Sequence, residues 1–353
     1  MKYLLRKSMI SMDIGTYETK IIVAKQQKKH IVVENVYKIP TPSGACEDGY
    51  LKDKEILEKG INDFLYKQKI KATQAICTIQ STATITRELI LPFVKSSDEL
   101  ASMVRLEIEQ YLPIQLEDYV VEHKVLEEFV EEGIKKLRIV VVALPKKIVE
   151  EYLQFIYNLN LKPVALDIHN NAVSKVFDQE VKINEENYSL DKTVVTIDMG
   201  YANINISIID RGILRFSRII SQGGKDIDIN IANVFNLSVE DAENKKIEHG
   251  NLKLSLNKTS PSVMMNELIQ ATVDNWLQEI QRIFQYYTSR NTIYRIDEIY
   301  LYGGSSKIPY LPEYMMNTLQ IPTFLLDNIS HIKCPEGIIL RDYLNVAAAM
   351  IRK

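Results

Sequence analysis

The chain has 353 residues, of which 46% are hydrophobic, and 43 basic side chains stand against 46 acidic ones. This length is enough for two domains with well-buried cores. The near-balanced charge excludes the basic surface that nucleic-acid-binding proteins need. Three distant cysteines and five scattered histidines exclude a disulfide framework and a recognisable metal motif. No apolar run approaches the length of a membrane span, so we expect a cytoplasmic protein without direct membrane insertion.

The first motif lies near the start of the chain, where two apolar segments flank Asp13-Ile14-Gly15-Thr16. Their pattern predicts a strand, a tight turn and a returning strand. A glycine in such a turn lets backbone amides approach a phosphate closely. Asp13 can hold a hydrated Mg²⁺ beside that phosphate, and Lys20 on the returning strand adds a positive charge. A plain hairpin turn is the alternative interpretation of this motif by itself.

A second copy of the motif, Asp198-Met199-Gly200, favours the functional interpretation. It follows the apolar segment Thr193–Ile197 and precedes the alternating segment Ile204–Ile208. A third expected strand comes after each copy, at Ile31–Tyr37 and at Leu214–Ile220. Two matched turns predict a duplicated unit whose turns face each other across a cleft.

Helical and strand patterns alternate between the two motifs. A block at about residues 93–160 predicts a small inserted subdomain, and its first helix begins at Ser96-Ser97-Asp98-Glu99, which has capping-box spacing. The polar residues 178–192 are interpreted as a link between the halves. The other expected elements of the first half are helix Asp53–Gln68, strands Ala75–Ile79, Thr82–Leu91, Tyr119–Leu126 and Lys136–Leu144, helix Pro145–Asn158 and strand Val164–Asp167.

Two glycine turns distinguish the second half. Gln222-Gly223-Gly224 precedes an expected helix, and Gly303-Gly304-Ser305-Ser306 follows an expected strand. Such turns at a helix entry are typical of phosphate or nucleoside sites. The expected elements are helices Asp226–Phe235 and Glu240–His249, a long helix after Pro261, strand Ile299–Tyr302 and a last helix Asp342–Ile351.

Two Asp-x-Gly hairpins followed by a Gly-Gly-Ser turn resemble the motifs of the actin-like ATPase superfamily. Asp13-Ile14-Gly15-Thr16 with Lys20 is similar to its first phosphate motif. Asp198-Met199-Gly200 is similar to the second, and Leu301–Ser305 to the adenosine motif.

Three further stretches resemble a narrower group, the PilM family of cytoplasmic actin-like proteins in type IV pilus assembly. Val104–Ile114 is similar to its Val-Arg-x-Glu-x-Glu-x-Tyr-x-Pro-Phe segment. Phe216–Gly224 is similar to its Phe-x-Arg-x-x-x-x-Gly-Gly run, and Ala242–Lys246 to its Ala-Glu-x-x-Lys helix. The resemblance covers essentially the whole chain.

The resemblance implies an α/β protein with the actin-like ATPase fold, in which two duplicated RNase H-like domains with inserted subdomains surround a nucleotide cleft. The first half would span residues 1–190, with an FtsA-like subdomain at about 93–160. The second half would span residues 191–353, with a subdomain at about 225–295. Each half would be built on a five-stranded mixed sheet.

ATP and Mg²⁺ are the ligands that the resemblance implies. The turns at Gly200, Gly223 and Gly224 would adjoin them, and Asp13 and Asp198 would organise the water shell of the metal. The expected phosphate contacts are Gly15, Thr16, Tyr17 and Lys20, and the expected nucleoside contacts are Glu243, Lys246, Gly303, Gly304 and Ser305.

The chain departs from the superfamily pattern at the positions that serve hydrolysis. The second phosphate motif usually supplies hydroxyls after its glycine, where this chain has Ala202, Asn203 and Ile204. Hydrolases of the superfamily orient water with a Glu or Gln where this chain has His169, near Asp167, and Asp228 stands where a Thr is common. Asp167 and His169 are the candidate catalytic residues, and we expect weak ATP turnover at most.

The resemblance also implies a partner, the short cytoplasmic N-terminal peptide of a PilN-like inner-membrane protein, which would hold the chain at the inner face of the membrane. The inserted subdomain and the neighbouring first-half sheet would form the peptide groove. The expected walls are Val104, Ile108, Tyr111, Leu112, Pro113 and Ile114, although a core role for this apolar stripe is an equal alternative. Other pilus assembly components are further expected partners, and self-association stays open.

Two other functions remain as alternatives. One is an FtsA-like, filament-forming protein, which we place lower because we expect no C-terminal amphipathic membrane segment. The other is a small-molecule kinase on the same fold, which would need a general base, and Asp167 and His169 are the only candidates that the sequence offers. A fold that hosts so many functions does not decide among them.

Overall fold

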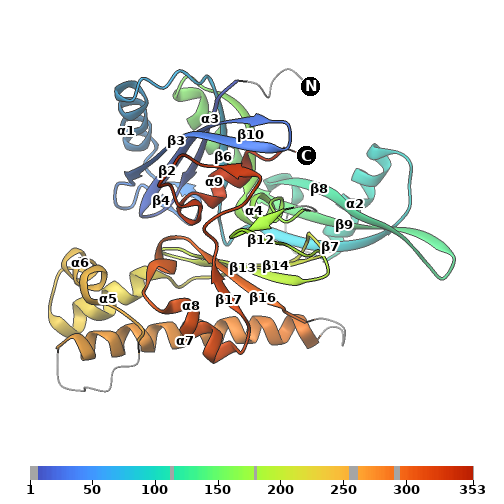
Figure 1. Cartoon of the computed structure of the whole chain (residues 1–353). Coiled ribbons are helices and arrows are strands. Elements are labelled where there is room, and N and C mark those ends of the chain that lie inside the picture. Colours follow the sequence, from blue (N-terminus) through green and yellow to red (C-terminus); the bar gives the residue numbers. More distant parts are fainter. Residues whose placement is uncertain (1–6, 112–114, 179–180, 254–260, 290–294, 353) are drawn as a thin grey trace. The chain divides into compact units, whose positions relative to one another are not determined.

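The computed structural model describes residues 7–111, 115–178, 181–253, 261–289 and 295–352 (Figure 1). The chain forms two compact units that interleave along the sequence. Unit 1 contains Ile21–Tyr37 and Asn170–Lys353, and unit 2 contains Ser8–Lys20 and Lys38–His169. The proposed halves, 1–190 and 191–353, remain a prediction.

The first sheet has the strand order β10-β6-β1-β2-β3-β18. Strand β1 is buried along its whole length, because apolar residues surround Ser11 and Asp13 in the segment Met-Ile-Ser-Met-Asp-Ile. β6 pairs in parallel with both β1 and β10. The strands are β10 (Lys162–Ile168), β6 (Gln74–Ile79), β1 (Met9–Ile14), β2 (Glu18–Gln27), β3 (His30–Pro40) and β18 (Ile332–Lys333).

The second sheet repeats this topology with the order β17-β16-β13-β14-β15. β13 is again central and fully buried, pairs antiparallel with β14 and runs parallel to β16. The five strands correspond in order to β10-β6-β1-β2-β3, so the duplication expected from the two turns is present in the sheets. The strands are β17 (Thr323–Leu325), β16 (Glu298–Tyr302), β13 (Thr193–Met199), β14 (Ile204–Asp210) and β15 (Ile213–Ile220).

A three-stranded antiparallel sheet, β7-β9-β8, and helix α2 (Ser97–Tyr111) form a separate small core in unit 2. The strands are β7 (Ile85–Pro92), β9 (Ile134–Pro145) and β8 (Tyr119–Glu131), and the 3₁₀ helix η2 (Leu116–Asp118) precedes β8. β7 lies before the expected boundary near residue 93 but pairs with β9 from end to end. The β8–β9 hairpin extends beyond α2 (Figure 1).

Helices cover the sheets of both units, and in unit 1 the long helix α7 runs along the second sheet (Figure 1). Trp276, Ile280 and Phe284 of α7 are buried in the core that this sheet shares with α5. The helices are α1 (Lys54–Lys67), α3 (Lys146–Asn158), α4 (His169–Ser174), α5 (Gly224–Phe235), α6 (Val239–His249), α7 (Pro261–Ser289), α8 (Leu311–Leu319) and α9 (Leu344–Ala349), with 3₁₀ helices η3 (Gly304–Lys307) and η4 (Leu340–Asp342).

Two expectations differ from the structure. The first sheet has six strands instead of five, because Ile332 of β18 pairs in parallel with Ile31 of β3. Part of the expected link 178–192 forms the hairpin β11 (Lys182–Ile183) and β12 (Glu186–Asn187). Its turn residue Asn184 donates to Leu325 O (2.6 Å) and accepts from Asp327 N (3.0 Å), so side-chain hydrogen bonds hold a segment whose polarity suggested a link.

Candidate functional site

The first Asp-x-Gly turn closes as a tight reversal after β1. Gly15 N donates to Glu18 O (3.2 Å), and a Cβ on Gly15 would lie 2.9 Å from that oxygen, which explains the need for glycine. The Gly15 amide therefore closes the turn, and a phosphate contact from it would have to replace this bond. Thr16 is half-buried and Tyr17 is exposed at the tip.

Asp13 lies at the end of β1 and is hydrogen-bonded to His169, the first residue of α4. His169 Nε2 is 3.0 Å from Asp13 Oδ1, and both residues are buried. An ionised carboxylate can only accept, so Nε2 carries the proton. Asp167 stands at the same level of the sheet, since Asp13 and Asp167 both pair with Thr78 of β6. Sequence-predicted Asp13, Asp167 and His169 thus lie at one end of one sheet.

Lys20 on β2 shares the carboxylate of Glu18 with Lys38. Lys20 Nζ is 3.9 Å from Glu18 Oε1, at the outer limit of an ion pair, and Lys38 Nζ is 3.3 Å from the same oxygen. The side chains of Lys20 and Glu18 are 16% and 25% exposed, and at 3.9 Å their ion pair is a loose one. Lys20 can therefore turn to a phosphate at small cost.

Two buried thiols near Asp13 stay protonated. Burial, and then the negative charge of Asp13, raises the pKa of the Cys46 thiol to about 12. Burial and Asp13 also raise the pKa of Cys77 far above its usual range. A thiol with a raised pKa is a poor nucleophile, and both cysteines are buried in the core.

The second Asp-x-Gly turn has the geometry of the first. Gly200 N donates to Asn203 O (3.0 Å), and a Cβ on Gly200 would lie 2.5 Å from that oxygen. Asp198 at the end of β13 is buried, as Asp13 is in its own unit. The two turns are therefore equivalent in position, closure and burial.

The two glycine turns predicted in the second half, at Gly223 and Gly303, come together at Gly200 of the second Asp-x-Gly turn. Gly224 N donates to Gly200 O (3.0 Å), and Ser305 Oγ donates to the same oxygen (3.2 Å). A Cβ on Gly224 would lie 2.5 Å from Ser305 Oγ, and one on Gly223 would collide with Gly200 O and Tyr201 O. We call Gly200, Gly223, Gly224 and Gly303 the glycine cluster.

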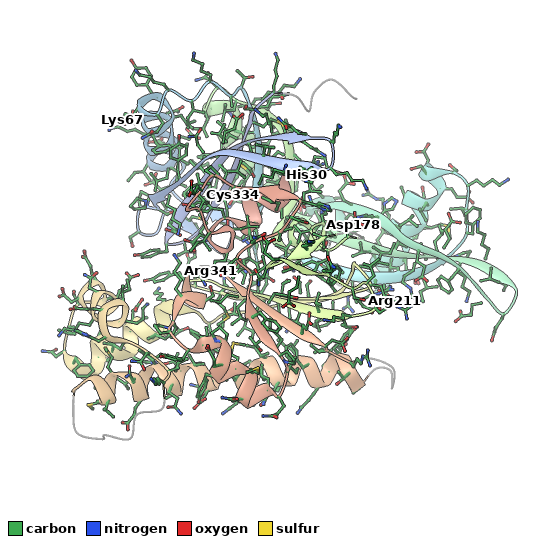
Figure 2. All side chains as sticks on the ribbon, in the orientation of Figure 1. His30, Lys67, Asp178, Arg211, Cys334 and Arg341 are labelled. Atoms are coloured by element: carbon green, nitrogen blue, oxygen red, sulfur yellow. The ribbon has the colours of Figure 1, made fainter. Side chains whose placement is uncertain are left out.

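Gly303 closes the glycine cluster against Asp198. It has a φ of +87°, and a Cβ there would collide with Asp198 Oδ1. Gly303 N donates to the backbone oxygen of Arg341 in η4 (3.2 Å), a residue that is labelled in Figure 2. Gly304, by contrast, has open space where a Cβ would stand.

Asp198 is held by Asn345, which the sequence did not point to, and Asn345 is held in turn by Tyr302 at the end of β16. Asn345 Nδ2 of α9 donates to Asp198 Oδ2 (2.8 Å), and Tyr302 OH donates to Asn345 Oδ1 (3.1 Å). Asn345 lies 147 positions from Asp198 and within an otherwise apolar helix. Only the expected duplication could have pointed to it, through its correspondence with His169.

The predicted nucleoside residues on α6 meet a buried carboxylate on α5. Lys246 Nζ is 2.6 Å from Asp228 Oδ1, although neither Asp228 oxygen has a partner in hydrogen-bond geometry. The pKa of Asp228 is raised to about 6, because burial and, to a lesser extent, the charge of Glu243 outweigh the lowering effect of Lys246. Lys246 is thus held by Asp228, at the place where the family pattern has a Thr.

These features are compatible with a phosphate-bearing ligand and a metal held through water. In unit 1 the glycine cluster packs backbone closely beside the anchored Asp198, and in unit 2 a side chain anchors Asp13 in the same way. Among the described residues, no three His, Cys, Asp or Glu side chains gather as a metal cage. Mg²⁺ on nucleotide phosphates keeps several of its waters and needs one or two carboxylates.

A family model described as type IV pilus assembly protein PilM matches residues 11–350. The chain belongs to the PilM family. Its fold is similar to that of a solved PilM-PilN type IV pilus biogenesis complex, with a TM-score of 0.79 and 20% identity over 99% of this chain and 100% of that one.

Two further solved structures share the actin-like ATPase fold predicted from the sequence. The ethanolamine utilization protein EutJ from Carboxydothermus hydrogenoformans has a TM-score of 0.57 and 13% identity over 99% of this chain and 91% of that one. MreB5 of Spiroplasma citri bound to ADP has a TM-score of 0.53 and 12% identity over 98% and 94%. The predicted PilM family and fold are both confirmed.

The segment expected to contact a partner peptide is only partly described in this PilM-family chain. Val104 and Ile108 are 1% and 3% exposed, because they pack against β7 and β9 in the small core of unit 2. As they stand, these two side chains are core residues and do not line an open groove. The Tyr111 side chain and residues Leu112, Pro113 and Ile114 lie outside the described part.

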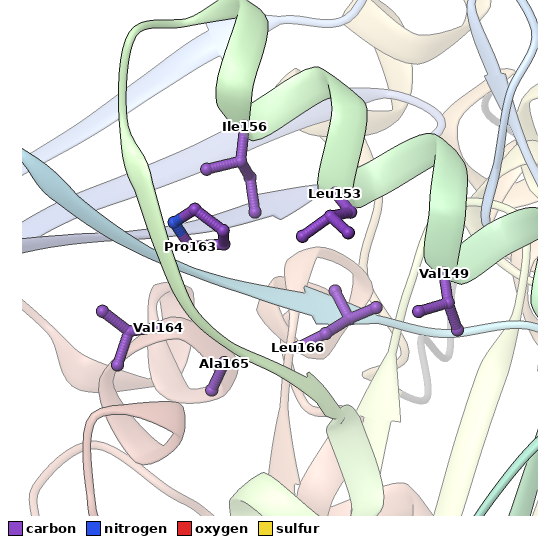
Figure 3. Close-up of a pocket in the computed structure, with 7 residues that line it drawn as sticks. All are labelled: Val149, Leu153, Ile156, Pro163, Val164, Ala165 and Leu166. Atoms are coloured by element: carbon purple, nitrogen blue, oxygen red, sulfur yellow. The ribbon is translucent and has the colours of Figure 1, made fainter.

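An apolar pocket lies elsewhere in unit 2, between α3 and β10 (Figure 3). It has a volume of about 230 Å³ and is lined by Val149, Leu153, Ile156, Pro163, Val164, Ala165 and Leu166. Leu153 and Val164 are 42% and 39% exposed. β10 is the first strand in the order of its sheet, with a bulge at Val164.

None of the helices in the described ranges is long and apolar enough to span a membrane.

Proposed function

We propose that this PilM-family chain is an ATP-binding cytoplasmic scaffold of a type IV pilus or related secretion assembly complex. It docks the N-terminal peptide of a PilN-like inner-membrane protein and is held at the membrane by that partner. Family membership supports the role in assembly. The observation that carries nucleotide binding is the convergence of the predicted glycine turns around Gly200 and Asp198.

Mg·ATP is the proposed ligand. Thr16, Tyr17 and Lys20 contact the phosphates, and Asp13 and Asp198 hold waters of the metal. Glu243, Lys246, Gly303, Gly304 and Ser305 contact the nucleoside. The metal would neutralise phosphate charge, and the chain's own part is to bind and orient. A solved structure with this fold, MreB5, is bound to ADP, which supports a nucleotide as the class of ligand.

Turnover of ATP is weak in this proposal. The position that serves to orient water in related hydrolases is His169, and His169 is hydrogen-bonded to Asp13. With Nε2 bound to Asp13, only Nδ1 of His169 is left to face a water, where those hydrolases have a Glu or Gln.

The α3–β10 pocket is the proposed anchor for the partner peptide. Two of its aliphatic side chains, Leu153 and Val164, are exposed and can contact apolar side chains of a partner. Pro163 lacks a backbone donor and Val164 forms a bulge, and both features discourage a continuous added strand. The peptide is therefore held by aliphatic side chains in the pocket, and the neighbouring subdomain contributes the polar rim.

Titration calorimetry tests the nucleotide part. Mg·ATP should release or take up heat with wild-type protein and raise its Tm, and Asp13→Ala should weaken the Mg²⁺-dependent part of binding. Absence of both heat and thermal shift for wild type would overturn the site assignment.

A further inference from the structure

The duplicated topology places Asn345 where the first repeat has His169. In each repeat, a central strand ends in a buried aspartate, and a short helix later in the chain supplies a side-chain donor to it. In unit 2, His169 of α4 bonds to Asp13 Oδ1 at 3.0 Å. In unit 1, Asn345 of α9 bonds to Asp198 Oδ2 at 2.8 Å.

The direction of the second contact follows from chemistry. Asp198, when ionised, can only accept, so the amide NH₂ of Asn345 must face it. The amide oxygen then faces Tyr302, whose hydroxyl donates to it at 3.1 Å. Tyr302 pairs directly with Asp198 across the parallel strands β16 and β13. Tyr302, Asn345 and Asp198 therefore form a polar chain in which Tyr302 fixes the orientation of the amide.

This chain matters because Asp198 is surrounded by backbone that leaves it little room. Gly303 lies against Oδ1 so closely that a Cβ there would collide with it. Asn345 holds Oδ2 from the other side, and both Asn345 and Asp198 are buried. The rotamer of Asp198 is thereby set before any ligand arrives.

We propose that Asn345 is a positioning residue for Asp198, which it orients toward the water shell of the Mg²⁺ that accompanies the nucleotide. The donor that orients the carboxylate comes from α9, which lies far from Asp198 in the sequence. The inference rests on the proposed nucleotide binding. Groups that orient a metal-holding carboxylate typically change metal affinity about 10–100-fold when they are removed.

The test compares Kd values for ATP in Mg²⁺ and in EDTA, with the full chain and titration calorimetry. Asn345→Ala should weaken binding about tenfold or more in Mg²⁺ and change it less than about twofold in EDTA. Tyr302→Phe keeps the side-chain amide of Asn345 but leaves it free to flip. This variant should lose less affinity for ATP than Asn345→Ala, and only when Mg²⁺ is present. The control is Asn184→Ala, which removes comparable side-chain hydrogen bonds in unit 1 and should change neither value.

The outcomes separate a positioning role from a structural one. If Asn345→Ala loses the same affinity for ATP in Mg²⁺ and in EDTA, Asn345 only supports the fold. If the variant loses no affinity, Asp198 needs no orienting partner. Either result overturns the inference. If wild type itself binds no better in Mg²⁺ than in EDTA, the proposed metal-nucleotide function fails and this inference fails with it. If Asn345→Ala does not fold, Tyr302→Phe decides by the same comparison.

Discussion

His169 Nε2 lies 3.0 Å from Asp13 Oδ1, and this hydrogen bond joins the candidate catalytic residue to the candidate metal-site carboxylate. Both side chains are buried, so the bond forms where a charge has few waters to stabilise it. The geometry makes His169 a donor that orients Asp13.

We therefore predict that His169→Ala weakens Mg·ATP binding about tenfold, because Asp13 loses a buried donor. His169→Gln retains an N–H donor and should lose less. Titration calorimetry with both variants measures the effect. If His169→Ala and His169→Gln reduce the affinity for Mg·ATP equally, His169 does not act through its hydrogen bond to Asp13.

Gly303 and Gly304 form a matched pair for testing the glycine cluster. Gly303→Ala places a side chain at a φ of +87° and against Asp198 Oδ1. Backbone strain alone costs about 1–3 kcal/mol, and the displaced aspartate should abolish Mg·ATP binding. Gly304→Ala meets open space, and we expect a change within about 0.5 kcal/mol and normal binding. Thermal unfolding measures the stability of both variants, and titration calorimetry measures their Mg·ATP binding. Equal stability and equal binding of Gly303→Ala and Gly304→Ala would contradict the close packing at Gly303.

Asp228 makes stability depend on pH. Burial raises its pKa from 3.8 to about 6. Between about pH 4 and pH 6, the carboxyl group therefore keeps its proton in the folded protein but has released it in the unfolded chain. This contribution to the free energy of unfolding is fully present below pH 4 and is lost as pH rises through 6. Relative to Asp228→Asn, wild type should lose roughly 2–3 kcal/mol between pH 4 and pH 8. Calorimetric unfolding of both proteins across this range measures the loss, and a constant difference would contradict it.

Local pattern predicted much of the fold. Alternating apolar segments around Asp13 and Asp198 identified the two hairpins, since a short buried strand and a glycine turn leave a clear trace in sequence. The turns at Gly223 and Gly303 were also visible. The hydrogen bond from Gly224 N to Gly200 O joins one of these turns to the second Asp-x-Gly turn. It depends on tertiary packing, which no local pattern encodes.

Long-range partners were not predictable from local pattern. Nothing around Asn345 distinguishes it from a capping or surface residue, and its partner lies 147 positions away. An apolar stripe such as the one with Val104 and Ile108 has the same sequence pattern whether it packs inside its own subdomain or contacts a peptide. In the structure, both side chains are buried in the small core of unit 2. The α3–β10 pocket is made by two elements that each look ordinary in the sequence.

The docking of a partner peptide is the central claim, and the α3–β10 pocket offers a sharp substitution. Leu153 lines the pocket and Gln154 is its exposed neighbour on α3, outside the lining set. Leu153→Glu and Gln154→Glu introduce the same charge on the same helix. Each buried aliphatic anchor contributes about 1.5–3 kcal/mol before ordering costs, so two or three should give a Kd near about 1 μM.

The direct measurement is a fluorescence titration of the full chain with the labelled cytoplasmic N-terminal peptide of the PilN-like partner, rich in Ile, Asn, Leu and Pro. Wild type and Gln154→Glu should bind near micromolar, and Leu153→Glu should bind at least about tenfold more weakly. Tyr111→Glu, in the same series, tests the end of α2 as a second contact. No binding to wild type, or equal binding by wild type and Leu153→Glu, would contradict docking at the α3–β10 pocket.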